Sequence, residues 1–175
     1  IKRYADLEKQ LIKKCFEHLT EDPNLVLSIN LSSRDMIDGD VSALVLNLLN
    51  KHNVAGRIVF EIVEDEELKS AERVSVFIER AKSMGAMIAI DDFGSGYSNF
   101  SYIIKIKPDY VKIDGSIIKD IDINKDSYAI ASAIVAFAKD LGIKTIAEYV
   151  HSKEIFNVCK EIGIDEFQGL SLIHI

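Results

Sequence analysis

Short apolar runs alternate with longer amphipathic stretches along the whole chain, and this alternation limits the possible fold more than any other feature. The runs predict six strands, at residues 25–30, 57–63, 86–90, 110–113, 144–147 and 165–169. Short apolar strands joined by helices are typical of a parallel sheet that is covered on both faces. The pattern therefore predicts an α/β fold. An open doubly wound sheet and a barrel both fit it, and periodicity does not choose between them.

Helical patterns fill the segments before and between these runs. They predict helices at residues 1–19, 40–52, 67–85, 100–104, 125–142 and 152–163. In the first of these, Tyr4, Leu7, Leu11, Cys15 and Leu19 recur at intervals of three or four, so we expect them to face the core. Asp40 is the expected N-cap of the second. No linker interrupts the pattern, and 175 residues are enough for one domain with a core.

Composition narrows the class of protein. The formal net charge is −7, which argues against a surface that binds a nucleic acid polymer. No apolar run approaches the length of a membrane span. Cys15 and Cys159 both fall on apolar helix faces and are predicted to be buried free thiols. We therefore expect a reducing, cytoplasmic compartment, with the sequence leaving open whether a larger parent protein is tethered to a membrane.

Polar residues stand at or near the end of every predicted strand, where burial does not require them. They are Asn30, Glu61 with Glu64, Asp91 with Asp92, Lys112 with Asp114, Glu148, and Gln168. In a barrel, the carboxyl ends of the strands converge on one mouth. Several carboxylates in one cleft need cations, and oxygen ligands select hard ions such as magnesium, manganese or calcium.

The adjacent pair Asp91 and Asp92 suits a site with two metal ions, because one carboxylate can bridge the ions while its neighbour holds the second. Such sites usually drive in-line displacement at phosphorus. The glycines that follow, Gly94 and Gly96, resemble a dinucleotide-binding fingerprint, but the two aspartates would repel phosphates and Asn99 stands where that motif needs a small residue. We therefore interpret this segment as a mobile loop over a metal site.

The run "IDDFGSGYS" resembles the DDFGxGYS signature of the EAL-domain cyclic di-GMP phosphodiesterases, and "SINLS", "FEIVE", "VKID", "IAEYV" and "FQG" follow the family order. The resemblance implies a (β/α)8 TIM-like barrel, of which this chain carries about six of the eight strands. It also implies hydrolysis of cyclic di-GMP to linear 5'-pGpG with two magnesium or manganese ions. Sensor or GGDEF domains in the parent protein are further expected partners.

The resemblance also implies roles for individual residues. Asn30, Glu61, Asp91 and Glu148 would hold the first ion, Asp91 would bridge, and Asp92 would hold the second. Lys112 would orient the attacking water or steady the phosphate charge, and Glu148 has a second expected role as a base. Asp114 and Gln168 would complete the water network. Glu64 would anchor the loop at 93–99, which includes Ser95 and Gly96, and the protein would form a homodimer through this loop and the adjacent helix.

The chain departs from the family pattern in three places. The Glu-Ala-Leu segment, which carries one metal ligand, is absent, so we expect residues 1–169 to be a partial EAL domain that is weak or inactive alone. Tyr149 replaces a glycine and His151 replaces a glutamate, which keeps a non-catalytic cyclic di-GMP receptor open as an alternative function. Residues 170–175 do not follow the family and are expected to be a non-native tail.

Overall fold

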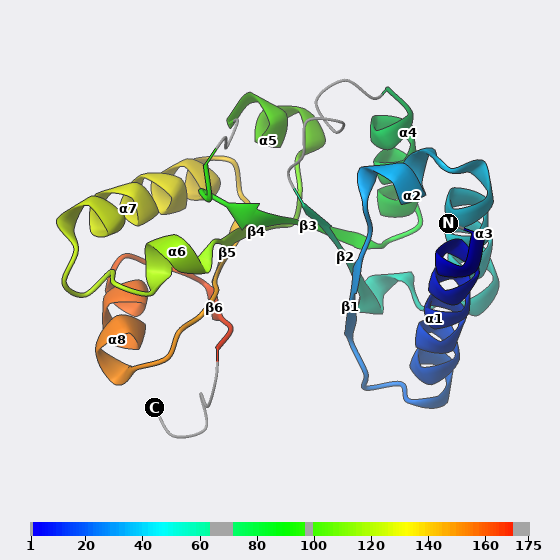
Figure 1. Ribbon diagram of the computed structural model, residues 1–175, viewed down its shortest axis with the longest axis horizontal. Helices are drawn as coiled ribbons and strands as arrows, with labels where there is room; N and C mark the ends of the chain where they lie inside the picture. The colour runs from blue at the N-terminus through cyan, green and yellow to red at the C-terminus, as the bar shows by residue number, and fades with distance from the viewer. Residues whose placement is uncertain (1, 64–71, 97–99, 170–175) are drawn as a thin grey trace. The chain divides into compact units, whose positions relative to one another are not determined.

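The computed structural model describes residues 2–63, 72–96 and 100–169. The chain divides into two compact units, Ile1–Ile88 (unit 1) and Ala89–Ile175 (unit 2), which are described in turn (Figure 1). The described residues contain six strands, and helices separate most of them. The pairs β1–β2, β3–β4, β4–β5 and β5–β6 are all parallel. This confirms the predicted α/β fold of the barrel type.

Unit 1 is mostly helical. Its elements are α1 (Lys2–Glu21), β1 (Leu27–Asn30), α2 (Ser33–Ile37), α3 (Gly39–His52), the 3-10 turn η1 (Ala55–Arg57), β2 (Ile58–Val63) and α4 (Glu72–Ser83). Strands β1 and β2 pair in parallel, with Asn30 in register with Glu61. Helix α1 lies beside α3 within the unit (Figure 1).

The packed face of α1 differs from the predicted one. Ile12, Phe16 and Leu19 are at most 2% exposed, whereas Leu7 and Leu11 are more than 60% exposed. Buried residues spaced by four and three lie on one side of a helix, and a leucine one position before Ile12 is turned about 100° away from it. Of the predicted stripe within the described side chains, Leu19 is buried and Cys15 is partly buried.

The start of α3 also differs from the prediction. The N-cap is Asp38, whose Oδ1 accepts hydrogen bonds from the backbone N–H groups of Asp40 (2.8 Å) and Val41 (3.3 Å). The short helix α2, which has a capping box formed by Ser32 and Asp35, was not expected. Asp38 ends α2 as its C-cap and begins α3 as its N-cap, so α3 starts at Gly39.

Unit 2 holds the remaining strands, with the boundary falling inside β3. The elements are β3 (Met87–Phe93), α5 (Phe100–Ile106), β4 (Tyr110–Ile113), α6 (Gly115–Ile118), α7 (Lys125–Asp140), β5 (Lys144–Ala147), α8 (Lys153–Glu161) and β6 (Glu166–Phe167). The strands pair in chain order, β3 with β4, β4 with β5, and β5 with β6, and every pair is parallel. Their carboxyl ends therefore lie at one edge, as the prediction required.

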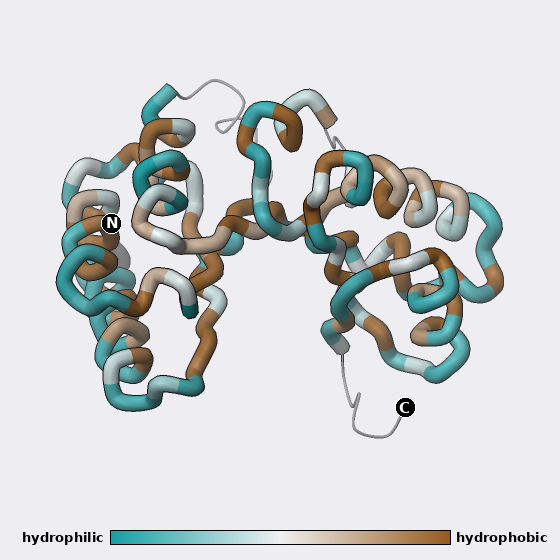
Figure 2. Tube along the Cα trace, turned by 180° about the vertical axis from the view of Figure 1, so that it is seen from behind, coloured by the Kyte–Doolittle hydropathy of each residue, from teal (hydrophilic) through white to brown (hydrophobic). Residues whose placement is uncertain are grey.

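Aromatic side chains fix the end of β3. Phe93 is 1% exposed and meets Phe100 edge to face at 5.4 Å between ring centroids, and Phe100 meets Phe137 of α7 in the same way at 4.7 Å. Apolar residues, brown in Figure 2, recur along the strands, and hydrophilic residues, teal, along exposed helical turns. This packing gives the polar end of β3 a rigid support.

Both cysteines are free thiols. Cys159 of α8 is fully buried, as predicted, while Cys15 of α1 is only partly buried. Across the described ranges, no helix combines the length and the apolar character that a membrane crossing needs.

Candidate functional site

A β-bulge in β3 brings Asp91 and Asp92 to the same side of the sheet. Ile90 is in register with Val111 and Phe93 with Ile113, so two residues of β3 stand opposite the single residue Lys112 of β4. In a regular strand, neighbouring side chains point to opposite faces. The extra residue, together with a positive φ of 55° at Asp92, breaks this alternation. The apolar pattern predicts that this strand ends at residue 90, whereas both aspartates lie inside it.

Lys112 is the buried cation of the site. It lies on β4, the strand between β3 and β5, so its ammonium reaches a carboxylate on either side. Its Nζ is 2.8 Å from Asp91 Oδ1 and 2.8 Å from Glu148 Oε1, and its side chain is only 3% exposed. An unpaired ammonium at this depth would be costly, and the two ion pairs offset that cost. Lys112 is therefore a buried lysine paired with two carboxylates.

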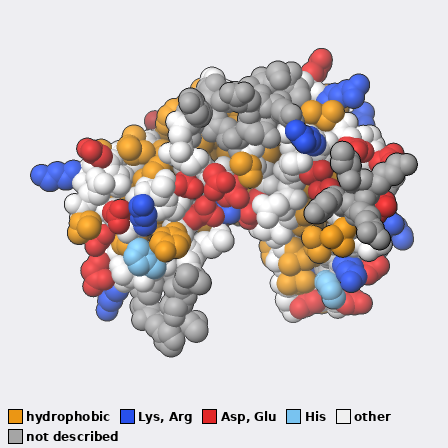
Figure 3. Space-filling view, in the orientation of Figure 1, with side chains coloured by type: hydrophobic (Ala, Val, Ile, Leu, Met, Phe, Trp, Pro, Cys, Tyr) orange, Lys and Arg blue, Asp and Glu red, His pale blue; other side chains and the backbone are white. Residues whose placement is uncertain are grey.

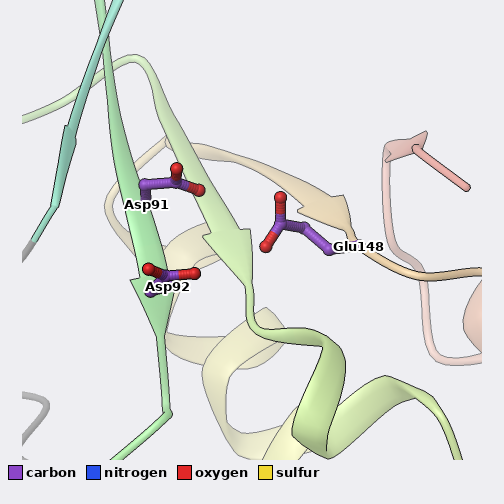
Figure 4. Close-up of side chains that lie close together, drawn as sticks. All are labelled: Asp91, Asp92 and Glu148. Atoms are coloured by element: carbon purple, nitrogen blue, oxygen red, sulfur yellow. The ribbon is translucent and has the colours of Figure 1, made fainter. Parts of the chain in front are cut away.

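Three carboxylates converge beside this lysine. Asp91, Asp92 and Glu148 each offer an oxygen, and these oxygens lie within 4.8 Å of one another. Figure 4 shows both aspartates of β3 pointing towards Glu148, which follows the end of β5. Acidic side chains gather over the β3–β4 region of unit 2 in the space-filling view (Figure 3). Three negative charges face one buried positive charge, so the cluster favours a further cation.

The pKa values of two of these groups reflect the crowding. Burial raises the pKa of Asp92, and the carboxylates of Asp91 and Asp114 raise it further, although Lys112 works in the opposite direction. Burial also raises the pKa of Glu148, against the lowering effect of its bond to Lys112. A divalent cation would relieve this repulsion by favouring the charged forms.

The donor atoms fit a hard divalent cation. All three groups are carboxylates, the ligand type that magnesium, manganese and calcium prefer. Although Asp91 Oδ1 forms the ion pair with Lys112, it is buried and accepts no well-aligned hydrogen bond from any described residue. A buried carboxylate oxygen with spare acceptor capacity is a suitable metal ligand.

Asp114 and Gln168 lie at the borders of this cluster. Asp114 caps α6 by accepting a hydrogen bond from the N–H of Ser116 (2.8 Å), and its carboxylate is close enough to raise the pKa of Asp92. Gln168 lies with Glu148 and Tyr149 in the wall of a cavity of about 440 Å³. Both predicted residues are thus close to the carboxylates.

The loop after β3 is only partly described. Gly94 has a φ of 100°, a backbone conformation that favours glycine, and a Cβ there would meet Cδ1 of Ile117, which would have to shift. Ser95 donates its N–H to the carbonyl of Asp92 (3.3 Å), and Ser95 and Gly96 are exposed. The predicted anchor Glu64 and residues 97–99 lie outside the described residues, as does the predicted tail at 170–175.

Asn30 and Glu61 belong to unit 1. They are side by side in the register of β1 and β2 and line a cavity of about 450 Å³ together with Glu8 and Asp35. Burial and the nearby carboxylates of Asp35 and Asp38 raise the pKa of Glu8. Because the two units are described separately, the participation of Asn30 and Glu61 in the unit 2 cluster stays a prediction.

Two features of the site escaped the sequence reasoning. The bulge was missed because an apolar run does not reveal where its register slips. The second feature is the position of Tyr149, which lines the cavity beside Glu148 and has a φ of 57°. The sequence held one signal for this: Tyr149 replaces a family glycine, and glycine adopts a positive φ freely, so the backbone at this position could be expected to have a positive φ. His151, by contrast, is exposed and contacts Tyr149 rather than the carboxylates.

Comparison with known proteins agrees with this geometry. The family model for the EAL domain matches residues 2–174. Over 98% of this chain, the sequence is 30% identical to cyclic di-GMP phosphodiesterase PdeB of Shewanella oneidensis. Over 87% of this chain, it is 32% identical to cyclic di-GMP phosphodiesterase PdeF of Escherichia coli. It spans about a fifth of the length of each of these curated relatives, 21% in both cases.

Solved structures show the same fold. The c-di-GMP complex of the PaMucR phosphodiesterase matches with a TM-score of 0.85 and 25% identity, covering 96% of this chain and 70% of that one. Klebsiella pneumoniae BlrP1 in a complex with manganese and cyclic di-GMP matches with a TM-score of 0.83 and 26% identity, covering 94% of this chain and 43% of that one. The chain belongs to the EAL domain family.

Proposed function

We propose that the protein carrying these residues hydrolyses cyclic di-GMP to linear 5'-pGpG in a reaction that requires divalent metal ions. The observation that carries the proposal is the convergence of Asp91, Asp92 and Glu148 on one side of the sheet, around the buried Lys112. Relatives named cyclic di-GMP phosphodiesterases, and a similar structure that holds manganese with cyclic di-GMP, support the same substrate and metal class.

The ligand set divides between two ions, magnesium or manganese. Asp91 and Glu148, with Asn30 and Glu61, would hold the first, and Asp91 would share the second with Asp92. Bound ions supply Lewis-acid polarisation of a phosphoryl oxygen and lower the pKa of a water molecule. The all-oxygen donor set is consistent with such ions.

Lys112 has a separate role in this proposal. Its ammonium is held between Asp91 and Glu148, so its charge and position are fixed before substrate binds. A preorganised positive charge stabilises negative charge that develops at a phosphate and orients an attacking water. Because Glu148 is bonded to this ammonium, we assign it as a metal ligand in preference to a free general base. Asp114 and Gln168 would order water around the cluster.

The remaining expectations concern assembly and location. We propose a homodimer formed through the 93–99 loop and the adjacent helix α5, with Glu64 as an anchor of that loop. We also propose covalently linked sensor or GGDEF domains. The proposal agrees with the small part, 21%, of each of the two curated relatives' length that this chain spans. A cytoplasmic location agrees with the two free thiols.

An assay of product formation tests the proposal. The protein that carries these residues is incubated with cyclic di-GMP and Mn²⁺, and linear dinucleotide is measured by chromatography. We expect turnover that Lys112→Ala and Glu61→Ala abolish. Lys144→Ala is the matched control, because Lys144 forms an exposed ion pair with Glu166 and lies over the ring of Tyr110. A thermal shift on adding Mn²⁺, lost in Asp91→Asn, reports on metal binding independently of activity.

A non-catalytic receptor is the second candidate, favoured by the departures at Tyr149 and His151. The two functions separate cleanly in solution. A receptor binds cyclic di-GMP tightly in EDTA and yields no linear product with Mn²⁺, whereas the proposed enzyme yields product only with the metal. Retention of the whole carboxylate and lysine set around β3 to β5 favours the enzyme.

A further inference from the structure

Tyr149 combines a strained backbone with an exposed aromatic ring. Four described non-glycine residues have positive φ: Asn53, Asp92, Lys107 and Tyr149. Asn53 and Lys107 directly follow the ends of α3 and α5, where such a conformation ends a helix. Asp92 and Tyr149 instead lie at the ends of strands, in or next to the carboxylate cluster. Strain of this kind, held at a site, points to a use for the side chain.

The neighbouring backbone holds this conformation in place. The N–H of Glu148 donates to the carbonyl of Ile113 (3.2 Å), and the N–H of Val150 donates to the carbonyl of Gln168 (3.1 Å). Val150 is also completely buried. The residue between these two anchors must adopt φ near 57°. Glycine would do so without strain, so the fold itself gives no reason for a tyrosine here.

The ring is held at the rim of the cavity that contains Glu148 and Gln168. Tyr149 is packed against Gly115, where a Cβ would come within 2.9 Å of the tyrosine Cβ. The His151 ring lies 5.2 Å from the tyrosine ring, tilted by 55°, and its Nδ1 is 3.1 Å from the carbonyl of Tyr149. These contacts orient the side chain, yet the residue remains 52% exposed. A ring so exposed contributes little to the core.

We propose that Tyr149 is a substrate-binding residue, on which a guanine base of cyclic di-GMP stacks while the phosphate lies at the carboxylate cluster. This inference rests on the proposed function, because it takes the cavity beside Glu148 as the substrate site. An aromatic ring next to a phosphate-binding position suits a nucleotide, since every base presents a planar face to stack on. Tyrosine offers that face at a low cost in side-chain entropy.

The first test makes position 149 a fluorescent reporter. The chain contains no tryptophan, so Tyr149→Trp carries a single indole. We expect cyclic di-GMP to quench its fluorescence in a saturable manner, because a stacked guanine quenches indole, and ribose 5-phosphate, which lacks a base, to leave it unchanged. Tyr128→Trp is the matched control: Tyr128 is 40% exposed on α7 and lines a different cavity, so its signal should not respond.

Substitutions that remove the ring measure its contribution to affinity. We expect Tyr149→Phe to keep the wild-type Kd for cyclic di-GMP, and Tyr149→Gly to weaken binding by about 5- to 100-fold, the range for loss of one stacked base. Because glycine relieves the positive φ, Tyr149→Gly should unfold at the same or a higher temperature, which excludes misfolding as the cause of weaker binding.

The outcomes separate the inference from the proposed function. Quenching at position 149 together with weaker binding by Tyr149→Gly supports both. If calorimetry shows that cyclic di-GMP binds, but the indole at 149 is not quenched or Tyr149→Gly binds as tightly as wild type, the stacking role is overturned and the proposed function stands. If the wild-type protein that carries these residues does not bind cyclic di-GMP at all, with Mn²⁺ or without it, both are overturned.

Discussion

The polar residues at the strand ends have different surroundings in the two units. In unit 2, Asp91 and Glu148 share the buried ammonium of Lys112 at 2.8 Å each. In unit 1, Asn30 and Glu61 stand in register in a cavity whose described lining includes two further carboxylates and no lysine or arginine. Among the described residues, a buried ammonium thus lies between the strand-end carboxylates of unit 2. Unit 2 also has a bulge that aligns two carboxylates and an internal cation that holds them.

The largest expected effect comes from removing that cation. Lys112→Ala leaves Asp91 and Glu148 largely buried without their shared partner, so we expect a loss of about 3–5 kcal/mol in the free energy of unfolding, measured by chemical denaturation without metal. Turnover should also fall below detection. The control Lys144→Ala, which breaks a pair with both partners about half exposed, should change stability by no more than about 0.5 kcal/mol. Equal effects of the two substitutions would show that the buried ion pairs of Lys112 stabilise the protein no more than the exposed pair of Lys144.

Matched amide substitutions compare one carboxylate from each unit. Asp91→Asn removes one charge of the buried ion pair with Lys112 and should reduce stability, and Glu61→Gln makes the equivalent change in unit 1. If both residues bind the same metal ion, each substitution should lower turnover by about 100-fold or more at a fixed Mn²⁺ concentration. Unchanged turnover in Glu61→Gln would confine the metal site to unit 2.

Substitutions at one helix cap in each unit test whether a loss of stability by itself lowers turnover. Asp38 caps α3 in unit 1, and Asn124 caps α7 in unit 2 with a bond of 2.9 Å to the N–H of Asp126. Asp38→Ala and Asn124→Ala should each cost about 1 kcal/mol. At a temperature well below unfolding, we expect turnover to stay within about twofold of wild type. A large loss of turnover in either variant would mean that stability alone explains the effects of the site substitutions.

The smallest effect concerns the two thiols, one in each unit. Burial raises the pKa of both, and that of Cys159 to about 11. The thiolate is the reactive form and its fraction increases with pH, so at pH 8 roughly one molecule in a thousand carries Cys159 as thiolate. We expect Ellman's reagent to titrate the partly buried Cys15 in the native protein and Cys159 only in denaturant. Rapid reaction of both thiols would show that α8 opens readily.

Much of the fold could be predicted because local sequence and burial agree. Strands β4 and β5 begin and end where the apolar pattern predicts, since isolated runs between helices have no competing interpretation. The short helices α2 and α6 were missed, because four or five residues show no period. The face of α1 was wrong because two apolar stripes share that helix, and only packing chooses between them.

The membership of the site was easier to predict than its geometry. The resemblance identified Asp91, Asp92, Lys112 and Glu148 from residue types alone. It did not reveal that β3 continues through both aspartates, because register depends on the neighbouring strand and not on the strand's own sequence. The place of Tyr149 at the cavity was hidden for the same reason, since it depends on contacts with Gly115 and His151.

The bulge in β3 has a consequence for how this protein can change during evolution. Deleting either aspartate would leave one residue opposite Lys112 and would return β3 to a regular register with β4. The flanking residues Ile90 and Phe93 would keep their partners, so the fold would survive or even gain regularity. A one-codon deletion at this point should therefore be tolerated structurally and still abolish the pair of carboxylates.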